Sequence, residues 1–138
     1  MDIVVQKFGG TSVGSVERIA AVAELVKNSS QKNNIVVVVS AMSGETNRLI
    51  DLAKTFSDSP NKREFDALVS TGEKVSSSLL AIALDSIGVK AKSLSASQIS
   101  MKTTSSYSKA RILDIDSSKI IKTIEDGFIP IITGFQGV

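Results

Sequence analysis

The chain has 138 residues, of which 42% are apolar and 22% charged, and its formal net charge is +2. This composition indicates one folded domain with a sizeable core and excludes a disordered chain. The basic residues are too scattered to predict a nucleic-acid or membrane-surface ligand. Cysteine and histidine are both absent, which excludes disulfides, thiolate metal sites and His-dependent catalytic triads. Any chemistry must therefore use Lys, Arg, Asp, Glu, hydroxyl groups and backbone amides.

The apolar runs of the sequence are short. None reaches the roughly 20 residues that a membrane-spanning helix needs. The N-terminus begins with a strand-like pattern and carries no signal peptide. These features predict a cytoplasmic protein with no membrane partner.

The N-terminal segment joins an apolar strand pattern to a glycine-rich loop. The run Ile3–Val5 predicts a buried strand, and the loop 9–14 leads from it into a helix that Ser15 caps. Such a junction is a common anion site, because backbone amides and the helix dipole favour negative charge there. Lys7 adds a positive charge at the strand exit. The segment predicts phosphate binding, although an ordinary tight turn explains the same residues equally well.

The rest of the chain alternates between helical and strand-like patterns. The continuous β-branched run 35–39 is typical of a parallel strand that is buried on both faces. The longest helix is predicted over about 62–87, and residues 95–109 are predicted to form an irregular or hairpin excursion. The other predicted elements are a short helix after Thr46, strands at 89–94, 110–115 and 128–133, and a helix that ends at Gly127. This order predicts an α/β fold, a three-layer αβα sandwich with a mostly parallel sheet.

Polar loops follow several of the predicted strands. In open parallel sheets, ligands bind beyond the carboxyl ends of the strands, so the loops 7–15, 40–47 and 133–137 are expected to meet at one edge. Ser40 could donate a hydrogen bond to a phosphate or a carboxylate. Thr46 could do the same, although capping of its own helix is the simpler interpretation.

The longest predicted helix carries a glutamate at the edge of its apolar stripe. On the helical wheel Glu73 lies at this edge, whereas Lys74 points to the opposite side. Glu73 could therefore face a cleft and Lys74 should not. Taken alone, a partly solvated surface glutamate is the simpler interpretation. Arg111 is interpreted as a structural residue.

Several motifs resemble one known family. Lys7–Val13 (KFGGTSV) resembles the N-terminal signature of aspartate kinases, in the amino acid kinase superfamily. Other amino acid kinases carry different glycine loops at this place, so the motif is specific. The segments that resemble the same family, in the same order, are 40–44 with 46–47, 70–73, 103–104, 109–112 and 134–137. Together they cover nearly the whole chain, which is identified as a member of this family.

The resemblance implies a phosphotransferase with a carboxyl acceptor. The implied reaction is ATP-dependent phosphorylation of the side-chain carboxylate of L-aspartate to 4-phospho-L-aspartate, the first step towards lysine, threonine and methionine. ATP and L-aspartate are the implied partners, and Mg²⁺ is expected with ATP, although the sequence identifies no protein ligand for it. The full-length protein is expected to be a homo-oligomer. Phosphoryl transfer depends mainly on positioning and electrostatics, so a chain without His and Cys is compatible with it.

The resemblance also implies roles for residues at the phosphate end of the site. Lys7 would be the catalytic residue that stabilises charge on the transferring phosphoryl group. The amides of Gly9 and Gly10 would hold the phosphates, and Ser12 would be a further member of the ATP site.

The substrate end is implied to consist of Ser40, Thr46 and Glu73, with the glutamate facing the ammonium group of aspartate. Full-length aspartate kinases continue past the last glycine loop and supply there an arginine for the substrate. Arg48 and Arg111 are not obvious substitutes for that arginine.

The expected domain is therefore residues 1–138 as a truncated N-terminal portion of an amino acid kinase catalytic domain. Most of the ATP-binding half and the paired ACT regulatory domains would be absent, and the piece alone is expected to be inactive. The alternative is a stand-alone, non-catalytic module that binds a small ligand or supports assembly.

Overall fold

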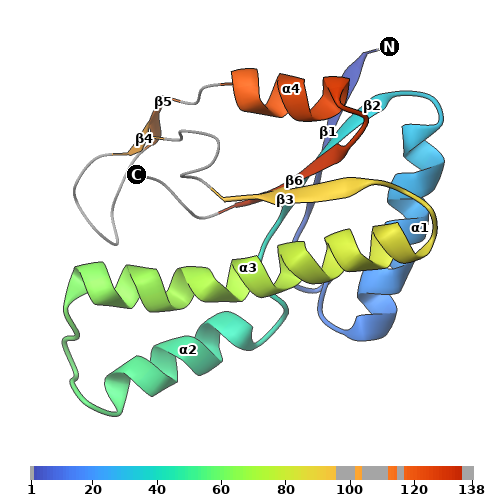
Figure 1. Cartoon of the computed structure of the whole chain (residues 1–138). Helices are drawn as coiled ribbons and strands as arrows, with labels where there is room; N and C mark the ends of the chain where they lie inside the picture. Colours follow the sequence, from blue (N-terminus) through green and yellow to red (C-terminus); the bar gives the residue numbers. More distant parts are fainter. Residues whose placement is uncertain (1, 96–101, 104–111, 115–116, 135–138) are drawn as a thin grey trace.

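The structure, a computed structural model, describes residues 2–95, 102–103, 112–114 and 117–134 (Figure 1). The strands are β1 (Ile3–Phe8), β2 (Asn34–Val39), β3 (Ala91–Leu94), β4 (Lys102–Thr103), β5 (Ile112–Asp114) and β6 (Ile129–Thr133). The helices are α1 (Val16–Ser30), α2 (Glu45–Lys54), α3 (Lys62–Ser86) and α4 (Ser118–Glu125).

The main sheet is parallel throughout. Its strand order is β1-β2-β6-β3, and every neighbouring pair runs in the same direction. The short strands β4 and β5 form a separate antiparallel pair. This pair falls where the excursion and the strand 110–115 were predicted, and the other residues of those two segments lie mostly outside the described ranges.

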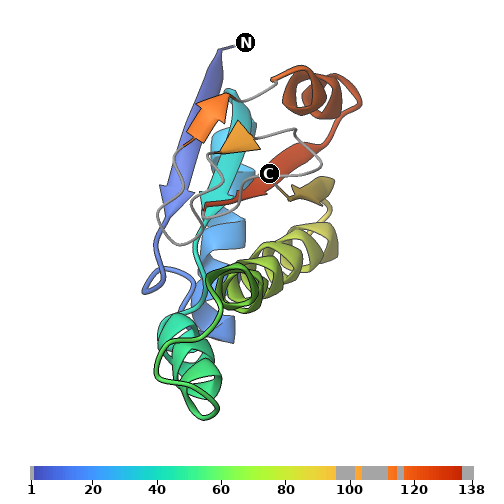
Figure 2. The ribbon, with the colours of Figure 1, turned by 90° about the vertical axis from the view of Figure 1, so that its left-hand side faces the viewer.

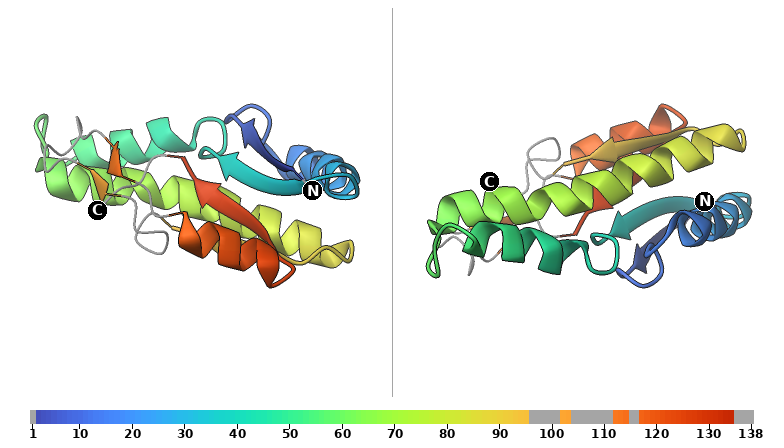
Figure 3. Two further views of the ribbon diagram at one scale, coloured as in Figure 1. Left: turned by 90° about the horizontal axis from the view of Figure 1, so that it is seen from above. Right: turned by 90° about the horizontal axis from the view of Figure 1, so that it is seen from below.

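Helices cover both faces of the sheet. Residues of α1 and α3 form one core with the inner face of β2 and β6. Ile120 and Ile124 of α4 pack with Val36, Leu94 and Ile132 on the opposite face. Figures 2 and 3 show α3 and α4 on opposite sides of β6, with α2 lying beside α3. The predicted αβα sandwich is confirmed.

The predicted helix ends are largely confirmed. Ser15 caps α1, because its hydroxyl accepts a hydrogen bond from Arg18 N at 3.2 Å. Gly88 and Gly127 follow α3 and α4 with φ of +85° and +89°, a left-handed conformation that glycine adopts without strain.

The prediction that β1 is buried is wrong for the described residues. Ile3 is 51% exposed and Val5 is 62% exposed. β1 is the edge strand of the sheet and pairs with β2 alone among the described strands. Its apolar composition makes burial favourable, but none of the described elements covers its outer face. By contrast, all five residues of β6 are buried.

The longest helix is part of the core. By length and composition α3 is the one described helix that could cross a membrane. However, Leu80 and Leu84 of this helix are fully buried in the core that it forms with the sheet. A core helix of a globular domain has the same properties, so α3 is no evidence of a membrane span.

Candidate functional site

A cavity of about 330 Å³ opens beyond the carboxyl end of β2. Three segments form it: the loop after β1, the loop after β2 with the start of α2, and α3. The lining residues are Gly10, Ser40, Ala41, Met42, Ser43, Gly44, Thr46, Val69 and Glu73. The cavity thus brings together Gly10, Ser40, Thr46 and Glu73, four of the site residues predicted from the sequence.

The glycine loop after β1 is docked against the loop after β2. Ser43 N donates a hydrogen bond to Gly10 O at 3.1 Å. A Cβ atom at position 10 would lie 3.0 Å from Ala41 O, which is tighter than nine in ten real Cβ contacts. The close approach of the two backbones therefore favours glycine at position 10.

The same loop folds back on itself. Ser12 N and Val13 N both donate to Gly9 O, at 3.0 and 3.3 Å. Gly9 and Ser12 belong to this turn and do not line the cavity. They lie next to the predicted phosphate end, at the entrance to α1.

A second glycine lets α2 approach α3. A Cβ atom at Gly72 would lie 3.1 Å from Ala41 Cβ and 3.2 Å from Glu45 Cγ. The first turn of α2, which carries Thr46, is therefore held beside the α3 turn that carries Glu73. The N-cap of α2 is Gly44, with φ of +84°, and Thr46 lies inside the helix. The interpretation of Thr46 as a helix cap is wrong.

Glu73 lines the cavity from α3. It is 8% exposed, whereas its neighbour Lys74 is exposed on the far side of α3. The orientation predicted from the helical wheel is confirmed, and the simpler interpretation of a surface glutamate is wrong.

Lys7 approaches the same edge from the other face of the sheet. Gln6 donates to Ser29 Oγ of α1 at 3.0 Å, and Phe8 packs against the core that α1 and α3 form. Because side chains alternate along a strand, Lys7 points away from that core. It is exposed and does not line the cavity, although Ser40 N donates to the neighbouring Phe8 O at 3.2 Å. Lys7 and the cavity thus flank one carboxyl edge.

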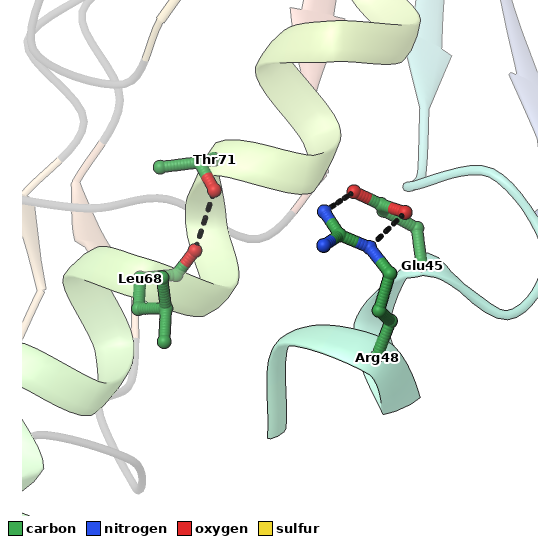
Figure 4. A network of polar contacts seen from close by, with 4 residues as sticks. All are labelled: Glu45, Arg48, Leu68 and Thr71. Atoms are coloured by element: carbon green, nitrogen blue, oxygen red, sulfur yellow. Dashed lines mark hydrogen bonds and ion pairs between the residues drawn. The ribbon is translucent and has the colours of Figure 1, made fainter. Parts of the chain in front are cut away.

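Arg48, in the first turns of α2 beside the cavity, already has a partner. Arg48 binds Glu45 through two hydrogen bonds, Nη2 to Oε1 at 2.7 Å and Nε to Oε2 at 3.0 Å (Figure 4). The hydrogen bonds from Arg48 lower the pKa of the Glu45 carboxyl, and Glu45 raises the pKa of Arg48. On the neighbouring helix, Thr71 Oγ1 donates to Leu68 O at 2.6 Å. Arg48 is thus engaged outside the cavity lining, and Arg111 lies outside the described residues.

The last glycine loop of the predicted site is only partly described. Gly134 N donates to Val39 O at 3.0 Å, which brings the start of the last glycine loop beside the end of β2. The rest of that loop lies outside the described residues. Within the described ranges, no group of three or more acidic side chains is placed to hold a metal ion.

Sequence reasoning missed one polar contact beside the cavity. Ser76 is fully buried on α3, and its Oγ donates to Ser40 O at 2.6 Å. The available signal was a hydroxyl residue within the apolar stripe, one turn after Glu73.

Comparisons with known proteins agree with this geometry. The model of the Amino acid kinase family matches residues 2–138. An aspartate kinase of Pseudomonas putida is 55% identical over 139 residues, which cover 100% of this chain and 34% of that protein. An aspartokinase of Geobacillus stearothermophilus is 52% identical with the same coverage. The chain thus spans about a third of the length of these curated relatives.

Solved structures show the same fold. The aspartate kinase from Synechocystis has a TM-score of 0.85 and 45% identity, over 98% of this chain and 22% of that one. E. coli aspartokinase III, in complex with aspartate and ADP, also has a TM-score of 0.85, over 99% of this chain and 41% of that one. Its identity is 21%, so this likeness concerns the fold alone. The resemblance to aspartate kinases is confirmed, and the chain belongs to the amino acid kinase family.

Proposed function

We propose that this chain is the N-terminal portion of the catalytic domain of an aspartate kinase, over residues 1–138. The observation that carries the proposal is the cavity, because it gathers Gly10, Ser40, Thr46 and Glu73 from three separate segments. The sequence relatives support the proposal, since aspartate kinases such as those of P. putida and G. stearothermophilus exceed 50% identity across the chain. Most of the ATP-binding half and the regulatory domains would then lie outside these residues.

The cavity suits a small amino acid. Glu73, with 8% exposure, is a strong acceptor for an ammonium group, because ion pairs strengthen where water is excluded. The hydroxyls of Ser40 and Thr46 can donate to a carboxylate at the other side of the cavity. L-Aspartate carries both groups and a second carboxylate that would be the phosphoryl acceptor.

The phosphate end would lie at the carboxyl edge of β1. The amides of Gly9 and Gly10, with Ser12, would hold the phosphates of ATP, which brings Mg²⁺ to neutralise part of their charge. Lys7 would stabilise the charge on the transferring group. A carboxylate oxygen of aspartate forms the new bond to the γ-phosphorus while the bond to ADP breaks. The acceptor is already ionised and needs no general base.

The proposal extends to the whole protein. The full-length protein would be a cytoplasmic homo-oligomer that makes 4-phospho-L-aspartate for lysine, threonine and methionine synthesis. The 138 residues alone would be inactive, because the substrate arginine and most of the nucleotide pocket would lie elsewhere.

Hydroxylamine trapping of aspartyl phosphate tests this function. We expect hydroxamate from the full-length protein with ATP and L-aspartate, and none from the 138-residue chain. Lys7→Ala should abolish the product. Full activity of this variant would contradict the role of Lys7, and strong activity of the short chain would contradict the claim of missing parts. Aspartate binding without any hydroxamate from the full-length protein would favour a non-catalytic ligand-binding module.

Glu73→Gln tests the ammonium contact. Loss of a charge-assisted hydrogen bond should raise the aspartate KM roughly tenfold to a hundredfold and leave the ATP KM within about twofold. Glu64→Gln is the matched control, because Glu64 is an exposed carboxylate on the same helix. Equal effects on both KM values would count against the contact.

A further inference from the structure

Helix α3 satisfies most of its hydroxyl groups internally. Four of them donate to the carbonyl three residues earlier in the same helix: Ser70, Thr71, Ser77 and Ser86. Such local bonds are the usual state of a hydroxyl inside a helix. These four bonds do not involve a neighbouring helix, strand or loop.

Ser76 makes a different bond. Its Oγ lies 2.6 Å from Ser40 O, 36 residues away, and 3.1 Å from Glu73 O in its own helix. A hydroxyl has one proton to donate, so the shorter contact to Ser40 is the hydrogen bond. Ser76 is fully buried, which protects this bond from competition with water.

The acceptor of this hydrogen bond, Ser40 O, belongs to a loop that lines the cavity. Ser40 is the first residue of the loop 40–44, and all five residues of this loop line the cavity. Glu73 lines the same cavity from α3, one turn before Ser76. The nearby contact at Gly72 is a van der Waals packing of Ala41 and Glu45 against the helix. The Ser76 bond adds a directional link between this loop and α3.

We propose that Ser76 is a positioning residue for the small substrate. It holds the loop 40–44 in register with Glu73, so that Ser40 and Thr46 face the glutamate across the cavity. The proposal deepens the proposed function and rests on it for the identity of the substrate. Ser76 does not line the cavity itself and acts through the loop.

Ser76→Ala in the full-length protein tests this role, with Ser77→Ala as the matched control. Both side chains are buried on the same helix, but Ser77 donates to Lys74 O of α3. Loss of one buried hydrogen bond should raise the aspartate KM roughly fivefold to tenfold in Ser76→Ala and leave the ATP KM within about twofold. Ser77→Ala should leave both KM values within about twofold. Equal behaviour of the two variants would overturn the proposal.

Amide hydrogen exchange of the same proteins gives a readout that needs no catalysis. Ser76→Ala should speed exchange at the amides of 40–44 roughly fivefold to tenfold, and Ser77→Ala should not. Unchanged exchange in Ser76→Ala would overturn the proposal. If the wild-type protein makes no hydroxamate, the proposed function fails, and the exchange experiment still decides whether Ser76 holds the loop.

Discussion

β1 and β6 are both short, apolar strands of one parallel sheet, but their surroundings differ. β6 lies between β2 and β3, and its residues contact helices on both faces. Ile131 of this strand is 0% exposed. β1 lies at the edge, where Val5 is 62% exposed. The same kind of side chain therefore contributes to the core in one strand and faces solvent in the other.

The difference between β1 and β6 shows how much an apolar strand pattern in a sequence can predict. It reports that burial of the strand is favourable, because β-branched residues pack well on a pleated surface. It does not report which element performs the burial, since that element can be far away in sequence. The contribution of each strand to the free energy of unfolding therefore depends on the elements that pack against it.

Truncation of one side chain in each strand should give the largest contrast. Ile131→Ala should lower the free energy of unfolding by about 2–5 kcal/mol, because it removes buried methyl groups and leaves a cavity. Val5→Ala should change it by about 0.5 kcal/mol or less, as at other exposed sites. Urea unfolding followed by circular dichroism measures both. Similar losses in the two variants would mean that β1 is covered in solution.

The one polar side chain of β6 gives a smaller effect of opposite sign. Thr133 is 1% exposed, and its Oγ1 has no hydrogen-bond partner among the described residues. Thr133→Val replaces a buried hydroxyl by a methyl group of similar size, so it should raise the free energy of unfolding by roughly 1–2 kcal/mol.

Thr123 is the control for that substitution. It is 3% exposed, but its Oγ1 donates to Lys119 O at 2.8 Å. Thr123→Val therefore should not stabilise the protein. A gain in both variants would point to a general preference for valine, and not to the lack of a partner for Thr133 Oγ1 among the described residues.

The inner face of β1 should show a moderate effect. Gln6 is partly buried against α1, where its Nε2 donates to Ser29 Oγ at 3.0 Å. A double-mutant cycle of Gln6→Ala and Ser29→Ala should give a coupling of about 1 kcal/mol. This cycle measures how strongly the inner face of β1 is anchored to α1. Additive effects would mean that the bond is not formed in solution.

Local patterns predicted most of the fold. The alternation of β-branched runs and helical stripes predicted the parallel sheet, and Ser15 and Gly88 marked helix ends through their own backbone chemistry. The helical wheel predicted that Glu73 turns inward. In each of these cases the information lies within a few residues of the feature.

Long-range features could not be predicted in the same way. Nothing near Ile3–Val5 says that β1 is an edge strand, because strand order is decided by residues far along the chain. Likewise, the place of Ser76 within the apolar stripe indicates that it is buried but does not indicate its partner Ser40, since that contact depends on how α3 crosses the loop 40–44. The sequence therefore predicted which residues gather at the carboxyl edge better than it predicted how they are held there.

The exposed face of β1 should show the smallest change in stability and a clear change in association. Val5→Lys places a charge on an edge strand, and such charges discourage pairing between copies. We expect the free energy of unfolding of the 138-residue chain to change by about 0.5 kcal/mol or less. Light scattering should show less self-association than in the wild type.

Leu25→Lys separates an edge-strand effect from a general gain in solubility. Leu25 is also half exposed, at 49%, but it lies on α1 and presents no unpaired strand edge. An equal reduction of self-association by both substitutions would contradict pairing through β1. A reduction by Val5→Lys alone would show that the exposed edge strand β1 takes part in self-association. β6 cannot pair with another copy, because both of its edges are already paired.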